Sequence, residues 1–253
     1  SEIGAQFTKI LQKQGIELML STKVENAAVK GNKVELTIVP SAGGKSSSIT
    51  ADKVLVSVGR KPFTDGLGLQ KLGINIDNRG YVSVNEKYAT SVPSIYAVGD
   101  VITGPMLAHK AEEEAVAAVE FMSGMSGHVN YGIIPSVVYT WPEVASVGIT
   151  EEQAKNAGIS YKVGKFPFLA NSRARATGNT DGLVKIIVDA STDRVLGAHI
   201  IGPDAGTMIA ELAIAMEFFA SSEDIARTCH AHPTLSEAIK EAALAVEKRC
   251  INM

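Results

Sequence analysis

Cysteine is scarce in this 253-residue sequence, which contains only Cys229 and Cys250. Two cysteines are too few for the disulfide framework of a secreted protein, so their number indicates a reducing compartment. Charge of one sign is also lacking, because 24 basic and 27 acidic residues leave a net charge of −3. This balance gives no reason to expect nucleic acid or an anionic membrane as a partner.

Long hydrophobic runs are missing as well. No stretch approaches the roughly 20 apolar residues that a membrane-spanning helix needs, and no targeting peptide is recognisable. A leading strand is also absent, because the chain runs at once into a helical pattern over residues 3–14. Helices of α/β domains usually follow strands, so we expect this chain to be a piece of a longer protein.

The first half of the chain reads as alternating helices and strands. We expect helices over residues 3–14 and 108–122 and a helical turn over 67–72. Strands are expected over 16–20, 24–30, 33–39, 52–58, 81–84 and 94–98. This order of elements, a helix, a strand, a meander and a return strand, predicts the second half of a nucleotide-binding α/β domain.

The second half changes character after a small, flexible segment, residues 123–127. Strands are expected over 136–140, 144–149, 161–166, 183–189 and 195–201, and helices over 204–219, 222–228 and 233–248. Thr150 and Gln153 form a capping-box signal for a further short helix. Strands followed by helices predict an α+β domain. The segment 207–219 is apolar over much of its circumference, so it either faces another subunit or lies wholly within the core.

A candidate acid–base pair lies in the segment His230–Glu237. Pro233 suits a first helical turn, which predicts a helix from about residue 233 with His232 at its start. Glu237 could then reach one ring nitrogen of His232, fix the tautomer and leave the other nitrogen as a general base. A helix cap beside a surface histidine and a solvated glutamate would give the same spacing.

A metal site in the same segment is disfavoured. Cys229, His230 and His232 are three potential ligands, but they lie within four residues of one another. Ligands so close in sequence cannot easily complete a tetrahedral shell alone, so we expect no metal here.

A second motif ends at Asp100. The run Ile95–Asp100 predicts a buried strand with a carboxylate at its carboxyl end, where it can accept hydrogen bonds from sugar hydroxyls. The start of the following helix would point free N–H groups into the same crevice.

Several motifs in the same order carry a family resemblance. They are Val56–Phe63, Ile95–Asp100 with Gly104–His109, Ser136–Gly148, Phe166–Arg175, Leu196–Gly202 and Cys229–Glu241. With these segments the chain resembles the flavin-dependent pyridine nucleotide-disulfide oxidoreductases, and among them most closely the dihydrolipoyl dehydrogenases. The resemblance implies an α/β plus α+β protein, with partial NAD- and FAD-binding Rossmann-like domains before an α+β dimerisation domain with an antiparallel sheet. The implied bounds are 1–62 for NAD, 63–128 for FAD and 129–253 for dimerisation.

The resemblance also implies cofactor-binding residues. Asp100 would hold the ribitol of FAD, and Met106, Leu107, Ala108 and His109 would lie against the flavin, without a catalytic role for the His109 side chain. Gly59 would let the chain pass close to the nicotinamide cofactor, where a side chain would obstruct it. Val24 would line the adenine site, although a strand valine is more often only part of a core.

The family resemblance assigns chemistry to His232 and Glu237. They match a base that deprotonates a dihydrolipoyl thiol and the carboxylate that orients this base, since the thiolate is the form that attacks a disulfide. Electrons would pass through a cysteine pair and FAD to NAD. The base would serve the flavin of another subunit, which implies a homodimer, and the partners would be lipoyl domains of 2-oxoacid dehydrogenase or glycine-cleavage complexes.

The sequence also departs from that family. A Cys-x4-Cys redox pair and both Gly-x-Gly-x-x-Gly phosphate loops are absent, and Cys229 and Cys250, which flank a helix, are no evident substitute. We therefore expect the carboxy-terminal half of such an enzyme, inactive alone. Alternatives are a glutathione reductase-like member, a mercuric reductase (which would have paired terminal cysteines) and a non-catalytic dimerisation module. The expected location is the mitochondrial matrix, or the cytoplasm in a bacterium.

Overall fold

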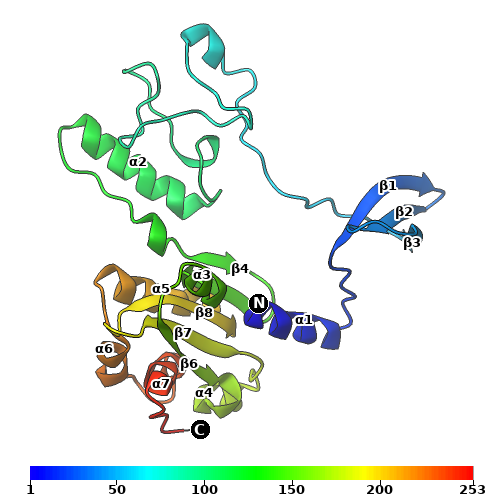
Figure 1. The fold of residues 1–253 in the computed structure, drawn as a ribbon. Helices are drawn as coiled ribbons and strands as arrows, with labels where there is room; N and C mark the ends of the chain where they lie inside the picture. Colours follow the sequence, from blue (N-terminus) through cyan, green and yellow to red (C-terminus); the bar gives the residue numbers. More distant parts are fainter. Residues whose placement is uncertain (253) are drawn as a thin grey trace. The chain divides into compact units, whose positions relative to one another are not determined.

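The computed structural model describes residues 1–252, which divide into two compact units (Figure 1). One unit combines residues 1–17 with those from 130 onward, and the other comprises residues 18–129. Within the described part of the chain, no helix has the length and apolar character needed to cross a membrane.

The first unit is built on a five-stranded antiparallel sheet in the order β4-β5-β8-β7-β6. Its strands are β4 (Ser136–Val138), β5 (Glu143–Gly148), β6 (Tyr161–Pro167), β7 (Leu183–Asp189) and β8 (Val195–Gly202). Short helices α3 (Glu151–Asn156) and α4 (Ser172–Thr177) lie in the connections. The predicted capping box is present, since the Thr150 side chain accepts from the Gln153 backbone and the Gln153 side chain accepts from Thr150. The α+β prediction is confirmed.

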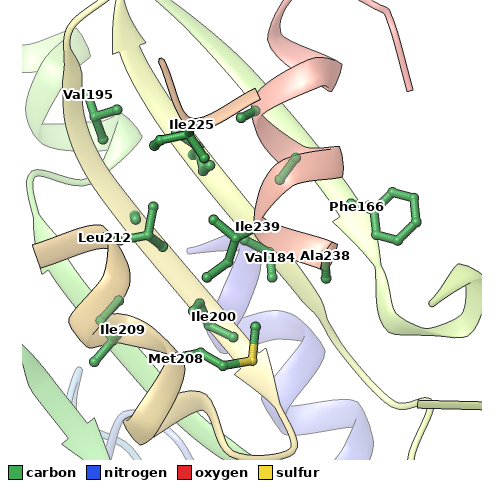
Figure 2. Packing of buried hydrophobic residues seen from close by; sticks show 14 of the residues in the cluster. Phe166, Val184, Val195, Ile200, Met208, Ile209, Leu212, Ile225, Ala238 and Ile239 are labelled. Carbon is green, nitrogen blue, oxygen red and sulfur yellow. The ribbon is translucent and has the colours of Figure 1, made fainter. Parts of the chain in front are cut away.

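Two helices cover one face of this sheet. Helix α5 (Ala205–Glu217) packs against β5 and β8, and α7 (Glu237–Val246) packs against β6 and β7, with α6 (Ser222–Arg227) beside α7. Alternate residues of the strands point towards these helices. Val184 and Ile200 from the sheet and Ile239 from α7 are fully buried in the resulting core (Figure 2).

Helix α7 lies very close to β6. A Cβ atom built on Gly164 would come within 1.9 Å of the carbonyl oxygen of Ala242. No side chain fits in that space, so the contact between this strand and this helix requires glycine.

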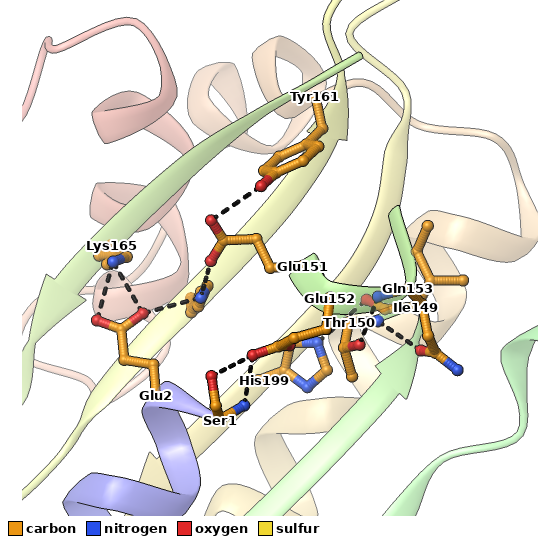
Figure 3. A network of polar contacts seen from close by, with 11 residues as sticks. Ser1, Glu2, Ile149, Thr150, Glu151, Glu152, Gln153, Tyr161, Lys165 and His199 are labelled. Carbon is orange, nitrogen blue, oxygen red and sulfur yellow. Dashed lines mark hydrogen bonds and ion pairs between the residues drawn. The ribbon is translucent and has the colours of Figure 1, made fainter. Parts of the chain in front are cut away.

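Helix α1 (Glu2–Lys13) packs against the other face of the sheet, where Phe7 and Ile10 contact Leu183 and Ile201. A polar network lies beside this contact (Figure 3). The Lys165 and Lys185 amines each donate to Glu2 at 2.8 Å, and Lys185 also donates to Glu151. Burial alone would lower the pKa of Lys185, but its hydrogen bonds to the two glutamates outweigh burial and raise it.

The second unit contains less regular structure. Strands β1 (Thr22–Lys30), β2 (Lys33–Pro40) and β3 (Ser47–Ala51) form an antiparallel meander. Helix α2 has the predicted bounds, Ala108–Met122, and packs on a small core that includes Ile74, Val82 and Tyr88. Single turns of 3-10 helix lie at Leu69–Leu72 and Gly99–Val101.

Four strand predictions in the first half were wrong. Residues 16–20 and 53–60 are irregular, and β3, at Ser47–Ala51, ends before the strand that was expected over 52–58. The segments 81–84 and 94–98 contribute only the isolated bridges Ile76–Val82 and Ala89–Tyr96. A buried strand needs neighbours on both sides for its backbone groups. In residues 1–252 the apolar run instead stays open to solvent, with Leu55 90% and Val58 93% exposed.

Candidate active site

His232 and Glu237 are in direct contact. The ring Nδ1 of His232 lies 2.8 Å from Oε1 of Glu237, so Nδ1–H donates to the carboxylate when that nitrogen carries the proton. The His232 side chain is 66% exposed and that of Glu237 is 19% exposed. The imidazole ring of His232 is thus exposed to solvent. Its contact with the partly buried Glu237 fixes the orientation of the ring and hence the direction of its second nitrogen, Nε2. This contact was predicted from the sequence and is confirmed.

The backbone around the pair differs from the prediction. Helix α7 begins at Glu237 rather than near Pro233, and the preceding residues form an irregular turn that contains a cis peptide bond between His232 and Pro233. Within that turn the Thr234 N–H donates to Oε2 of Glu237 at 2.8 Å, and the Thr234 hydroxyl donates to the Ala231 carbonyl at 2.8 Å. The prediction of Pro233 in the first helical turn was wrong, because Thr234 gives its N–H to the acid and the turn closes before the helix starts.

The electrostatics of Glu237 favour the ionised acid. Burial raises the pKa of this carboxyl, but the Thr234 N–H and the His232 ring outweigh burial and bring it below its ordinary value. Glu237 is also the first residue of α7, where the helix dipole favours a negative charge. The pair therefore has the features of a histidine base held by a carboxylate: a fixed contact, an ionised acid and an accessible ring.

His230 has a separate partner. Its Nε2 lies 2.7 Å from Oε1 of Glu211, and its Nδ1 lies 2.9 Å from the Thr228 carbonyl oxygen. Its side chain is only 7% exposed. Among residues 1–252, no three His, Cys, Asp or Glu side chains gather as a metal ion would require.

Asp100 lies on the 3-10 turn Gly99–Val101, in the second unit. Its carboxylate forms an ion pair with Arg60, which was not predicted from the sequence. Arg60 is 68% exposed, so this pair is solvated and the guanidinium can leave it at little cost. In the sequence, this ion pair is indicated only indirectly, by the positive charges in Gly59-Arg60-Lys61, which do not reveal a partner 40 residues away.

The turn that carries Asp100 is held by a buried ion pair. Lys110 and Glu114 lie 2.9 Å apart and both side chains are fully buried. Glu114 accepts the Gly99 N–H at 2.7 Å, and the Lys110 amine donates to the Gly99 carbonyl at 3.2 Å. This clamp was not predicted, although Lys and Glu four residues apart on one helix are the signal for such a pair.

The residues predicted to lie against the flavin form the start of α2. Leu107 is its N-cap residue, and the Leu107 side chain makes no capping hydrogen bond. The first N–H groups of a helix have no intrahelical partner, so this end can donate to an electron-rich group. Met106 and Leu107 are half-buried, whereas Ala108 and His109 are exposed.

The two residues predicted for NAD lie on separate segments. Val24 is on β1 and is 59% exposed. Gly59 has a φ of +119° in the irregular segment 53–60, and of the described residues none has an atom within 4 Å of a Cβ built there. The backbone angle suits glycine, but the space beside it is open, so both roles stay predictions.

Two sequence profiles of one family match the chain. Residues 1–115 match "Pyridine nucleotide-disulphide oxidoreductase", and residues 134–243 match its "dimerisation domain". These matches confirm the predicted combination of a nucleotide-binding oxidoreductase region and a dimerisation domain.

Curated relatives match along the whole chain. It is 58% identical to mitochondrial dihydrolipoyl dehydrogenase of Pisum sativum over 253 residues, which covers 100% of this chain and 50% of the relative. It is 58% identical over 245 residues to the mitochondrial dihydrolipoyl dehydrogenase of Homo sapiens (96% and 48%), and 59% identical over 245 residues to leghemoglobin reductase of Glycine max (97% and 47%). The chain spans about half the length of the curated relatives it matches.

Solved structures agree with the sequence matches. The fold resembles the HOCl-induced flavoprotein disulfide reductase RclA from Escherichia coli, with a TM-score of 0.87, 26% identity and coverage of 98% of this chain and 55% of that one. It also resembles LpdA from Mycobacterium tuberculosis, with a TM-score of 0.85, 26% identity and coverage of 94% and 51%. On its profiles, relatives and fold, this chain belongs to the pyridine nucleotide-disulphide oxidoreductase family.

Proposed function

We propose that this chain is the carboxy-terminal half of a dihydrolipoyl dehydrogenase, a flavoenzyme that oxidises dihydrolipoyl groups with NAD as the electron acceptor. The observation that carries the proposal is the 2.8 Å contact between His232 and Glu237 in a chain so similar to such enzymes. The redox cysteine pair would lie in the part of the parent protein outside this sequence. The chain alone is therefore inactive under this proposal.

His232 is the proposed general base. With Nδ1–H donating to Glu237, its Nε2 lone pair can accept the proton of a substrate thiol. The resulting thiolate attacks the redox disulfide, and the ionised Glu237 stabilises the imidazolium that forms. The open position of the ring suits a substrate that arrives at the tip of a long lipoyl arm.

Asp100 and the start of α2 are the proposed FAD-binding groups in this chain. A carboxylate on a clamped turn can accept hydrogen bonds from ribitol hydroxyls, and backbone N–H groups at the start of α2 would donate to the electron-rich flavin ring. Bound FAD would pass the electron pair from the disulfide centre to NAD. Gly59 and Val24 would contribute to the NAD site.

The proposed domains are residues 1–62 for NAD binding, 63–128 for FAD binding and 129–253 for dimerisation.

The proposed assembly is a homodimer that serves lipoyl domains of 2-oxoacid dehydrogenase or glycine-cleavage complexes. The dimerisation-domain match supports the homodimer. Names of the relatives support a mitochondrial location for the parent, and by extension the matrix where those complexes work.

The test is His232→Ala in the full-length protein. The variant should lose dihydrolipoamide oxidation by about 10²- to 10⁴-fold, the range that a general base contributes. Flavin absorbance should stay unchanged, because Asp100 and the start of α2 belong to a different unit from His232. His128→Ala is a matched control, since His128 is an exposed histidine outside both candidate sites.

Substrate choice is tested in the same preparation. The proposal expects turnover with dihydrolipoamide and little with glutathione disulfide. The reverse preference would indicate a glutathione reductase-like enzyme, and full activity of His232→Ala would contradict the assigned base.

A further inference from the structure

A chain of hydrogen bonds leads from the His232–Glu237 pair into the core. Glu237 uses one carboxylate oxygen for His232 and the other for the Thr234 N–H. The Thr234 carbonyl in turn accepts from the side-chain amide of Asn171 at 3.0 Å. Thr234 therefore contacts the acid with one backbone group and Asn171 with the other.

Asn171 is well placed to anchor this series of hydrogen bonds. It is 3% exposed, and its Oδ1 accepts the Ala174 N–H at 2.9 Å as the N-cap of α4. Its own N–H donates to the Phe168 carbonyl at 2.9 Å. Because the cap requires an acceptor, the NH2 group of the amide must point towards Thr234. Ala174 and Phe168 are fully buried, so both ends of Asn171 are tied to the core.

The turn between His232 and Ser236 needs such an anchor. His232 is largely exposed, and the residues before α7 form an irregular turn. The orientation of the ring depends on Glu237, and one oxygen of Glu237 is fixed by Thr234. A shift of Thr234 would therefore rotate the carboxylate and release the ring.

We propose that Asn171 is a positioning residue for the His232–Glu237 pair: its amide holds Thr234, Thr234 holds Glu237, and Glu237 keeps the proton of His232 on Nδ1 so that Nε2 stays free. The relevance to catalysis rests on the proposed function. Asn171 itself touches no reacting atom. A residue that served only as the cap of α4 would not need the donor to Thr234.

The first test uses Asn171→Asp in this chain. Aspartate keeps an oxygen for the Ala174 N–H and is as good an N-cap as asparagine, but it has no donor for the Thr234 carbonyl. The tautomer of His232 is read from long-range ¹H–¹⁵N spectra at about pH 8.5, where an ordinary imidazole is neutral. We expect Nδ1–H to predominate in the parent chain and a mixture of tautomers in the variant, with faster hydrogen exchange at the Thr234 amide.

Asn130→Asp is the matched control. Asn130 is another cap residue in the same unit, where its Oδ1 accepts the Gly132 N–H at 3.2 Å and its amide donates to Glu217 at 3.1 Å. Its substitution removes a comparable donor away from the turn and should leave the His232 tautomer unchanged. If Asn171→Asp does not fold, Asn171→Ser tests the same point, because serine can cap α4 without placing a carboxylate against Thr234.

An unchanged tautomer and unchanged Thr234 exchange in a folded Asn171 variant would overturn the proposal, as would an equal change in Asn130→Asp. In the full-length protein, Asn171→Asp should lower kcat about 10- to 100-fold, as a displaced catalytic group does, with flavin absorbance retained. Failure of the proposed function would show separately, as His232→Ala with full turnover, because the tautomer measurement requires neither cofactor nor activity.

Discussion

The Glu237 carboxylate receives a backbone N–H and a ring N–H, and these two contacts govern its titration. Burial of a carboxylate is unfavourable unless its oxygens are hydrogen-bonded. Here both oxygens have donors, so the ionised form is the stable one. The folded-state pKa lies below the ordinary value of 4.5, and the acid thus stays charged at neutral pH.

The titration of Glu237 can be predicted with its sign. The lowered pKa contributes stability that is present above pH 4.5 and is lost as the pH falls through the folded value. His232→Ala removes one of the contacts that lower the Glu237 pKa, so this pKa should rise towards 4.5. The Thr234 N–H remains hydrogen-bonded to the carboxylate and limits the rise. Carboxyl ¹³C shifts against pH would measure this, and a lower pKa in the variant would contradict it.

The contacts that were predicted from the sequence are local ones, although the local Lys110–Glu114 pair was not among them. His232 and Glu237 are five positions apart, and Thr150 and Gln153 are three apart, so one turn of chain brings each pair together. The Arg60–Asp100 pair depends on the tertiary fold, and no spacing rule indicates it.

At the scale of elements, the strands of the five-stranded sheet were predictable and isolated buried strands were not. The strands β5 to β8 lie in one antiparallel sheet, and all of them were predicted. The runs over 16–20 and 52–58 have the composition of central strands but lack neighbours within residues 1–252. Composition describes the environment in which a strand would be stable, whereas pairing partners decide whether it forms.

The contact between α1 and the sheet gives a prediction at this scale. Lys185→Met should lower the free energy of unfolding by about 1–3 kcal/mol, because Glu2 and Glu151 would lose their shared, 6% exposed cation. Amide exchange in α1 should accelerate, and urea unfolding measures the loss. Lys162→Met is the control: its pair with Glu247 is about half exposed, so it should cost less than about 1 kcal/mol. Equal effects would show that burial of the lysine is irrelevant.

At the scale of the whole molecule, the exposed end of α5 indicates a surface for association. Leu212 and Met216 face the core, but Ile214 is 62% exposed and Phe218 is 79% exposed. Large apolar side chains gathered at the surface of a soluble unit are typical of interfaces. The reading of residues 207–219 as wholly core is therefore wrong, because one side of the helix is open to solvent, and the reading that this side faces another subunit stays a prediction.

Dimer formation tests this surface. Phe218→Ser should weaken self-association of the chain at least about tenfold, as the loss of an aromatic contact at an interface does, without lowering the melting temperature. Val29→Ser is the control, because Val29 is also 79% exposed but lies on β1 in the other unit. Sedimentation equilibrium measures both variants. Identical dissociation constants for the parent and Phe218→Ser would place the interface elsewhere.

The contact between Gly164 and Ala242 has a consequence for how this protein can vary. Helix α7 starts at Glu237, so the distance at which this helix packs on β6 determines the position of the Glu237 carboxylate. Alanine at position 164 would force the helix outward by more than an ångström, since ordinary carbon–oxygen contacts exceed 3 Å. One strand position, far from the histidine in sequence, must therefore stay without a side chain if Glu237 is to keep its place beside that ring.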